Sequence, residues 1–304
     1  MPAQNNNAVK FLMLAILALI WGSSFILMKW GLTVYSWSQV GALRMFVSFL
    51  VMLPFVWNGF KKIEKKYWKF IAISGFLGNG IPAFLFPLAE THIDSAIAGI
   101  INSLTPLFTL LVGLFVFRTQ LSQNRIIGVL IGLAGAVAIV SGSGNNIDES
   151  HLQFSFYVIL ATICYAFSVN VLRHRLAEVD AVLITGFAIM FAGIPSGVYL
   201  FSTDFIDKTQ LATGAGFSLL SIVLLGVFGT AVSTFLFNKL IKISGALFAS
   251  SVTYLIPFVA ILWGISAGET LRVQQLIGFA AILFGVYLIN RSSKGNEEMK
   301  EIGK

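Results

Sequence analysis

The chain has 304 residues, of which 57% are hydrophobic and 11% are charged, and its mean hydropathy is +0.87. Soluble globular domains carry roughly a quarter charged residues, so this composition excludes an ordinary soluble domain and indicates a membrane protein. A net charge of +7 is also compatible with nucleic-acid binding. The basic residues lie between apolar segments, however, where they orient a protein in the membrane, so no nucleic-acid partner is expected.

Ten apolar segments predict an all-α integral membrane protein with ten transmembrane helices. Each is long enough to cross a hydrocarbon core of ~30 Å at ~1.5 Å per residue, and in lipid such a segment satisfies its backbone only as a helix. Residues 1–8 are expected to form a disordered N-terminus and residues 291–304 a charged tail. The expected spans are 9–29, 36–57, 68–89, 94–117, 124–142, 154–174, 181–201, 217–239, 245–267 and 274–290.

The basic residues predict how these helices are oriented. Of the 20 Lys and Arg residues, 16 lie on the same side of the expected membrane as the N-terminus. Three (Lys29, Lys208 and Arg272) lie on the opposite side, and Arg44 falls inside a span. Cytoplasmic loops carry such an excess of positive charge. We therefore expect both termini in the cytoplasm.

The second half of the sequence repeats the first. Pro106 and Gly113 in the fourth span recur as Pro257 and Gly264 in the ninth. Because each unit has five spans, an odd number, the second unit must lie upside down relative to the first. The sequence thus predicts two inverted repeats, 9–142 and 154–290, an arrangement typical of alternating-access transporters with a substrate site near the membrane midplane. Further matches pair Gly75 with Gly226, Gly78 with Gly229, Trp21 with Tyr165, and Ser24 with Ser168.

Several short motifs, taken in order, are similar to those of a known family. They are Trp21-Gly22-Ser23-Ser24-Phe25, Leu43-Arg44, Ile101-Asn102-Ser103-Leu104-Thr105-Pro106-Leu107-Phe108-Thr109 and Gly268-Glu269-Thr270-Leu271.

With these motifs the chain resembles the EamA branch of the drug/metabolite transporter superfamily over nearly its whole length. The resemblance implies ten helices in two inverted five-helix repeats, located in a bacterial inner membrane. It also implies transport of small organic solutes, often export of amino acids or related metabolites. The chain departs from the family at Thr119, where a glutamate is usual and where the second repeat has Glu269. The role of that carboxylate is then missing here or passes to another residue.

Polar residues at repeat-equivalent positions of the fourth and ninth spans form two stripes. Each proline frees a backbone carbonyl about one turn earlier, which can act as a ligand or as a flexible point. Matching stripes in the two halves suit a shared cavity, although hydroxyls and amides can also simply hold helices together. The stripes consist of Asn102, Ser103 and Pro106 on the fourth span, and Thr253, Tyr254 and Pro257 on the ninth.

Other polar and aromatic residues extend the candidate substrate site. Aromatic rings beside hydroxyls and amides suit organic solutes, although packing explains Trp21 and Tyr165 equally well. Pro106, Pro257 and Glu269 are the candidate hinge or gating residues. The additional substrate-binding candidates are Trp21 and Ser24 in the first span, Asn79 in the third, Tyr165 and Ser168 in the sixth, and Thr230 in the eighth.

Arg44 is the one basic residue expected at depth. It lies about eight residues into its span, so ~12 Å deep, where a charge costs about 3 kcal/mol and usually faces a wet interior. Our hypothesis is that Arg44 attracts a carboxylate or another anionic group of the substrate. The alternatives are that it extends to the outer interface or pairs with Glu90.

The remaining charged residues are expected at the surface. Lys29 is interpreted as an interfacial anchor. Glu90, His92 and Asp94 are interpreted as a solvated loop, and the alternative is that they gate transport or titrate, since His changes charge near neutrality. No acidic residue is expected deep in a helix, which argues against a proton relay. The glycines at 128, 132 and 135 form a small-residue face for close packing within the chain or for a dimer, so a monomer or weak homodimer is expected.

The sequence predicts an alternating-access facilitator or exporter of amino acids or amino-acid-like solutes. No phosphate-binding glycine loop or metal-spaced Cys/His cluster is present, so no enzyme activity, catalytic residue, cofactor or metal is expected. One alternative is an obligate exchanger of phosphorylated or nucleotide-linked metabolites, which should need more than one deep cation. Another is a membrane receptor or structural protein without transport activity.

Overall fold

The computed structural model describes residues 3–57, 59–118, 123–141, 149–250 and 252–302. Within these ranges the chain is helical and forms no strands. Seven helical segments are long and apolar enough to cross a membrane, and three shorter apolar helices span Ile127–Ala138, Val252–Ser266 and Val273–Gly285. Each of these segments overlaps one of the ten expected spans, so the prediction of an all-α membrane protein is confirmed.

In the first half, the third and fourth expected spans are composite. The third contains a π-helical turn between two α-helices, and the fourth is interrupted after Asn102. The elements are α1 (Ala3–Gly31), α2 (Trp37–Val56), η1 (Phe60–Lys62), η2 (Lys65–Tyr67), α3 (Trp68–Gly75), η3 (Phe76–Gly80), α4 (Ile81–Glu90), α5 (Ser95–Asn102), α6 (Thr105–Phe115) and α7 (Gln123–Ser141).

The second half repeats the π-helical turn in its third expected span. Its elements are α8 (Glu149–Arg175), α9 (Ala181–Phe201), α10 (Phe205–Leu211), α11 (Ala215–Leu224), η4 (Leu225–Val232), α12 (Ser233–Ser250), α13 (Val252–Ser266) and α14 (Val273–Ile302).

Helix boundaries differ from the expected ones where no proline interrupts the chain. α12 continues through residues 240–244, which were expected to form a loop, and this stretch contains no proline or glycine. α1 begins at Ala3 and α14 continues to Ile302, so the two polar ends extend the neighbouring helices. A helix needs no lipid to continue into water, so hydropathy marks the membrane core and not the helix end.

Local sequence explains where α2 and α9 begin. Ser36 accepts a hydrogen bond from the backbone N–H of Gln39, and the Gln39 side chain accepts one from the backbone of Ser36. Asp180 likewise accepts hydrogen bonds from two backbone N–H groups at the start of α9. These contacts satisfy donors that the first helical turn leaves free.

Pro106 explains the interruption between α5 and α6. It has no N–H to donate to the carbonyl of Asn102, four residues earlier. The hydroxyl of Thr105 instead donates to this carbonyl at 2.8 Å. Pro257 lies inside the continuous helix α13, so equivalent prolines have different local effects in the two halves.

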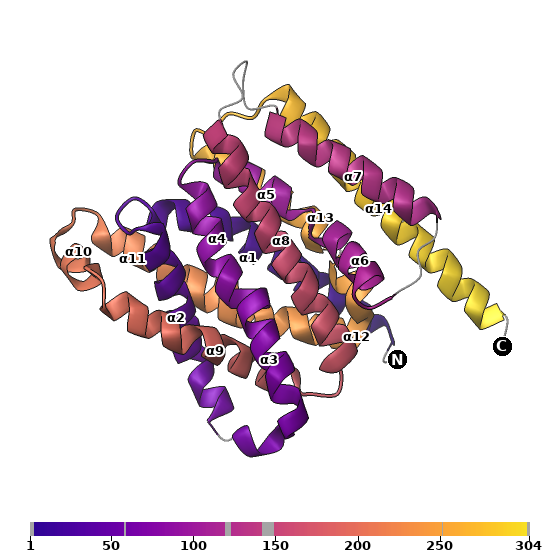
Figure 1. The fold of residues 1–304 in the computed structure, drawn as a ribbon, viewed down its shortest axis with the longest axis horizontal. Coiled ribbons are helices and arrows are strands. Elements are labelled where there is room, and N and C mark those ends of the chain that lie inside the picture. Colours follow the sequence, from indigo (N-terminus) through magenta and orange to yellow (C-terminus); the bar gives the residue numbers. More distant parts are fainter. Residues whose placement is uncertain (1–2, 58, 119–122, 142–148, 251, 303–304) are drawn as a thin grey trace.

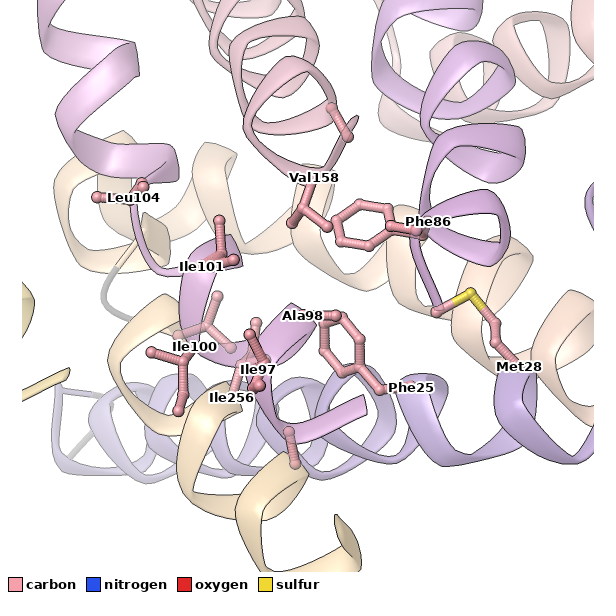
Figure 2. Close-up of a cluster of buried hydrophobic side chains, with 14 of the residues drawn as sticks. Phe25, Met28, Phe86, Ile97, Ala98, Ile100, Ile101, Leu104, Val158 and Ile256 are labelled. Atoms are coloured by element: carbon pink, nitrogen blue, oxygen red, sulfur yellow. The ribbon is translucent and has the colours of Figure 1, made fainter. Parts of the chain in front are cut away.

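A buried cluster joins the two halves of the chain. Figure 2 shows Phe25 of α1 beside Ala98 of α5 and Phe86 of α4 beside Val158 of α8, and Ile256 of α13 belongs to the same cluster. Most of these side chains are fully or nearly fully buried. The two halves therefore form one structural unit and are not separate domains.

Repeat-equivalent helices pack against each other in opposite directions. A β-carbon on Gly193 of α9 would contact Phe49 of α2, and one on Gly197 would contact Phe46, which occurs earlier in the chain. Residues later in α9 therefore contact residues earlier in α2. The second and seventh expected spans are thus antiparallel.

α7 and α14 form a second antiparallel pair at one edge of the molecule (Figure 1). A β-carbon on Gly135 would lie 2.6 Å from the carbonyl oxygen of Gly278, and one on Gly285 would meet the backbone of Gly128 and Gly132. The small-residue face of α7 is therefore used for close packing within the chain.

We expect Gly135→Leu to lower the apparent thermal midpoint by roughly 3–10 °C, because overpacking costs about 1–3 kcal/mol and this side chain would meet backbone atoms. Fluorescence-detected size-exclusion chromatography after heating in detergent measures the change. Gly216→Leu is the matched control, since nothing lies within 4 Å of a β-carbon there. Equal midpoints for the two variants would contradict this packing.

Candidate functional site

A cavity of about 140 Å³ lies between helices of both halves. Its walls come from α1, α2, α3, η3, α4, α5, α6, α8, α9, η4, α12 and α13. Many of the predicted substrate-binding residues lie around it, although they come from distant parts of the sequence. These residues are Trp21, Ser24, Arg44, Asn79, Asn102, Tyr165, Ser168, Thr230 and Thr253.

Two other candidates, Ser103 and Tyr254, are not among the residues that line the cavity. The hydroxyl of Ser103 donates to the backbone carbonyl of Ile100 and is almost fully buried. Consecutive residues on a helix point about 100° apart, so Asn102 and Ser103, or Thr253 and Tyr254, do not share one narrow face.

Arg44 faces the cavity from α2 and is only 8% exposed. Its Nε donates to Thr230 Oγ1 of η4 at 2.7 Å, and its Nη1 lies 3.9 Å from Met28 Sδ of α1. Such burial does not fit an arginine that extends to the membrane interface. Among the described residues, Arg44 is the only charged residue that lines the cavity.

The two π-helical turns bring backbone close to the helices of the opposite half. A β-carbon on Gly78 of η3 would clash with the hydroxyl of Ser168, and one on Gly229 of η4 would lie 2.8 Å from the hydroxyl of Ser24. Both glycines and both serines line the cavity. Each of these contacts is the repeat-equivalent of the other. Single π-helical turns of this kind occur frequently at functional sites.

Aromatic side chains have both a packing role and a lining role. The indole N–H of Trp21 donates to Ser233 Oγ at 2.9 Å and to the carbonyl of Gly229 at 3.2 Å. Tyr165 stacks on Phe86 with 6.0 Å between the ring centroids. Both Trp21 and Tyr165 nevertheless contribute to the cavity wall, so it combines apolar rings with hydroxyl and amide groups.

Glu269 joins three segments at one end of the helix bundle. Its carboxylate accepts hydrogen bonds from Lys29 Nζ at 2.6 Å, from Ser95 Oγ at 2.7 Å, and from the backbone N–H groups of Ser95 and Ala96 at 3.1 and 3.0 Å. Burial acts to raise the pKa of Glu269, but the hydrogen bonds from Lys29, Ala96 and Ser95 outweigh it and hold the pKa below its usual value.

The expectation that Lys29 is only an interfacial anchor is therefore incomplete. It forms an ion pair with Glu269, and its Nζ also lies 3.9 Å from Asp94 Oδ1. The carboxylate of Glu269, from the second half of the chain, lies at the N-terminus of α5 in the first half, and a helix N-terminus favours a negative charge. Thr119, the equivalent position in the first repeat, lies outside the described residues.

The expectation that Glu90 lies in a solvated loop is wrong. Glu90 is the last residue of α4 and is only 8% exposed. Neither of its carboxylate oxygens has a hydrogen-bond partner among the described residues. It interacts electrostatically with Glu269, Lys29 and Arg44. An acidic residue thus lies buried at a helix end, contrary to the sequence-based expectation.

Some residues that line the cavity were not predicted from the sequence. Ser74 shares a hydrogen bond of 2.9 Å with Ser168, and its position one turn before Gly78 was an available signal. Ile184 and Ala188 bring α9 to the cavity. These two are apolar residues within an apolar span, so no pattern distinguishes them from lipid-facing neighbours.

Comparisons with known proteins show a family of transporters. A model of the EamA-like transporter family matches residues 9–141 and again residues 154–291. An uncharacterized transporter of Archaeoglobus fulgidus is 26% identical over 284 residues, covering 93% of this chain and 99% of that protein. The uncharacterized inner membrane transporter YedA of Escherichia coli K12 is 26% identical over 283 residues, covering 90% and 88%.

Two more distant matches add a named activity and a fold. A Salmonella typhimurium protein named "Probable amino-acid metabolite efflux pump" is 22% identical over 288 residues, covering 90% of this chain and 92% of that protein. A crystal structure with 17% sequence identity superposes with a TM-score of 0.63, covering 95% of this chain and 99% of the other. The second match supports the fold alone.

Proposed function

Because the chain belongs to the EamA-like transporter family, we propose that it carries amino acids or amino-acid-like metabolites across the inner membrane by alternating access. The observation that carries this proposal is the burial of Arg44 against a small cavity lined by hydroxyls, amides and aromatic rings. A guanidinium binds carboxylates through two parallel hydrogen bonds. The remaining lining suits a solute with both polar and apolar parts.

Two inverted five-helix repeats provide the proposed moving parts. The family model matches the chain twice, which supports two copies of one unit. The antiparallel packing of α2 with α9 and of α7 with α14 supports their opposite orientation. Rocking of the halves would alternately expose the cavity, with the break at Pro106 and the kink-prone site at Pro257 as flexible points.

Both termini are proposed to lie in the cytoplasm, because the loops on the same side of the membrane as the N-terminus carry most of the positive charge. In this orientation the ion pair of Lys29 and Glu269 lies at the outer end of the bundle. By linking α1 to α5 and to the segment after α13, it would hold the outer side closed in this conformation.

The alternative of a nucleotide-linked or phosphorylated substrate is less well supported. Pockets for drug-sized ligands have volumes of ~300–1,000 Å³, well above the cavity volume of about 140 Å³. Such a substrate should also need more than one deep cation, and Arg44 is the only cation that lines the cavity in the described part of the chain. A zwitterion or a weak anion fits this lining better.

Counterflow in proteoliposomes tests the proposal. Vesicles loaded with one unlabelled solute are diluted into traces of the same labelled solute, for each of the twenty amino acids and for a set of sugar phosphates. We expect accumulation of at least one amino acid and of no sugar phosphate, relative to protein-free vesicles. Accumulation of sugar phosphates alone would favour the exchanger, and no accumulation of any solute would contradict both transport proposals.

A further inference from the structure

Glu90 is a buried carboxylate that the proposed transport site does not use. It ends α4, is 8% exposed, and does not line the cavity. Neither carboxylate oxygen accepts a hydrogen bond in the described part of the chain. A buried ionised carboxylate is costly unless it is paired, and the C-terminal end of a helix adds a further unfavourable interaction. Glu90 therefore lacks the contacts expected of a purely structural ion pair.

The charged groups around Glu90 leave it one available counter-ion. Lys29 of α1 attracts Glu90 electrostatically, but this ammonium is already bonded to Glu269 at 2.6 Å. Arg44 of α2 attracts Glu90 electrostatically without a direct ion pair to it, and no carboxylate is bonded to its guanidinium among the described hydrogen bonds. Glu269 adds negative charge, so it acts against a second anion nearby.

Other elements packed against α4 bring little further charge. η3 and α5 contain no titratable residue, and α8 brings Tyr165, whose hydroxyl interacts with Arg44. In the turn after α4, His92 is exposed and stacks on Phe154. Glu90 thus lies two residues from groups in contact with water, so a proton needs only a local opening to reach it.

Arg44 can interact with two anions: Glu90, which it attracts electrostatically, and the carboxylate of a solute in the cavity that Arg44 lines. If Glu90 and the solute carboxylate are both ionised, they repel each other and compete for one buried guanidinium, which is unfavourable in a low-dielectric interior. A proton on Glu90 removes this repulsion. The same guanidinium can then bind the carboxylate of the solute.

We propose that Glu90 is a proton-binding site, and that its proton crosses the membrane together with a carboxylate-bearing solute bound at Arg44. The proton adds to a carboxylate oxygen of Glu90 from water on one side and returns to water on the other, so no bond of the solute changes. When the solute leaves, Glu90 loses its proton and becomes the counter-ion of Arg44. This inference rests on the proposed function.

The test measures solute and proton movement in the same proteoliposomes. An equimolar mixture of the twenty L-amino acids, adjusted to the internal pH, is added outside vesicles that contain a trapped pH-sensitive dye. We expect the interior to acidify as solute enters the wild-type vesicles, with about one proton for each molecule moved. For Glu90→Gln the ratio of protons to solute should fall at least 10-fold, and Glu90→Asp should restore part of it.

Glu64→Gln is the matched control, since the Glu64 side chain is 67% exposed and its loss should leave both signals unchanged. Wild-type solute entry without acidification, or with alkalinisation, would overturn the inference while leaving the proposed function intact. An unchanged ratio in Glu90→Gln would do the same. If Glu90→Gln does not fold, the ratio of protons to solute in wild-type vesicles alone tests the inference. Absence of wild-type counterflow would instead contradict the proposed function.

Discussion

Arg44→Gln is expected to reduce transport of a carboxylate-bearing solute at least about 30-fold at subsaturating concentration. Truncating one partner of a buried, hydrogen-bonded charge pair costs about 2–5 kcal/mol, and 2 kcal/mol corresponds to this factor. Arg44 is 8% exposed and lines the cavity, so little water can replace its guanidinium. Initial rates of counterflow in proteoliposomes measure the effect.

Two control variants separate the charge of Arg44 from its geometry. Arg44→Lys keeps the charge but loses the planar fork of donors, so we expect an intermediate rate. Arg272→Gln removes an arginine that does not line the cavity, and its rate should match the wild type. A well-folded Arg44→Gln protein with wild-type transport would remove Arg44 from the substrate site.

Glu269→Gln is expected to lower both the thermal midpoint and the rate of transport, because it removes the ion pair with Lys29. A hydrogen bond to a charged group contributes about 1.5–3 kcal/mol, and the Glu269 carboxylate accepts several. The effect on stability depends on pH. Since the pKa of Glu269 is held below its usual value, its stabilising contribution is present above pH ~4.5 and is lost as the pH falls through the lowered pKa.

The thermal midpoint of wild type minus that of Glu269→Gln should therefore be constant between about pH 6 and 8 and shrink below about pH 4.5. A double-mutant cycle with Lys29→Met tests the partner. The effects of the two single changes should be clearly non-additive, because the side chains are in direct contact. Additive effects would show that the two residues stabilise the protein independently.

The positions of the spans and much of the cavity could be predicted from the sequence. Apolar length locates the helices, and Pro106 predicts a flexible point near Asn102, whereas the interruption of the fourth span there was not predicted. The internal repeat pairs Ser24 with Ser168 and made both candidates for the substrate site, and both line the cavity. The pattern did not separate Thr253 from its neighbour Tyr254, because the rotation of a helix is set by packing and not by local sequence.

The charged residues at the helix ends were predicted least well. Glu90 is buried although it follows an apolar span, since an uncertainty of one turn in the boundary moves a residue between water and the interior. The ion pair of Lys29 with Glu269 joins residues that are 240 positions apart, so no local pattern indicates it. The π-helical turns η3 and η4 also have no recognised local signature.

Alternating access requires a wet cavity that opens to each side of the membrane in turn. The most direct test places a single cysteine at Asn102 in a Cys164→Ser background and applies a membrane-impermeant thiol reagent to each side of the membrane. The cysteine should be labelled from both sides, and a transported amino acid should slow the labelling. A cysteine that reacts from neither side, or whose reaction no solute slows, would contradict alternating access.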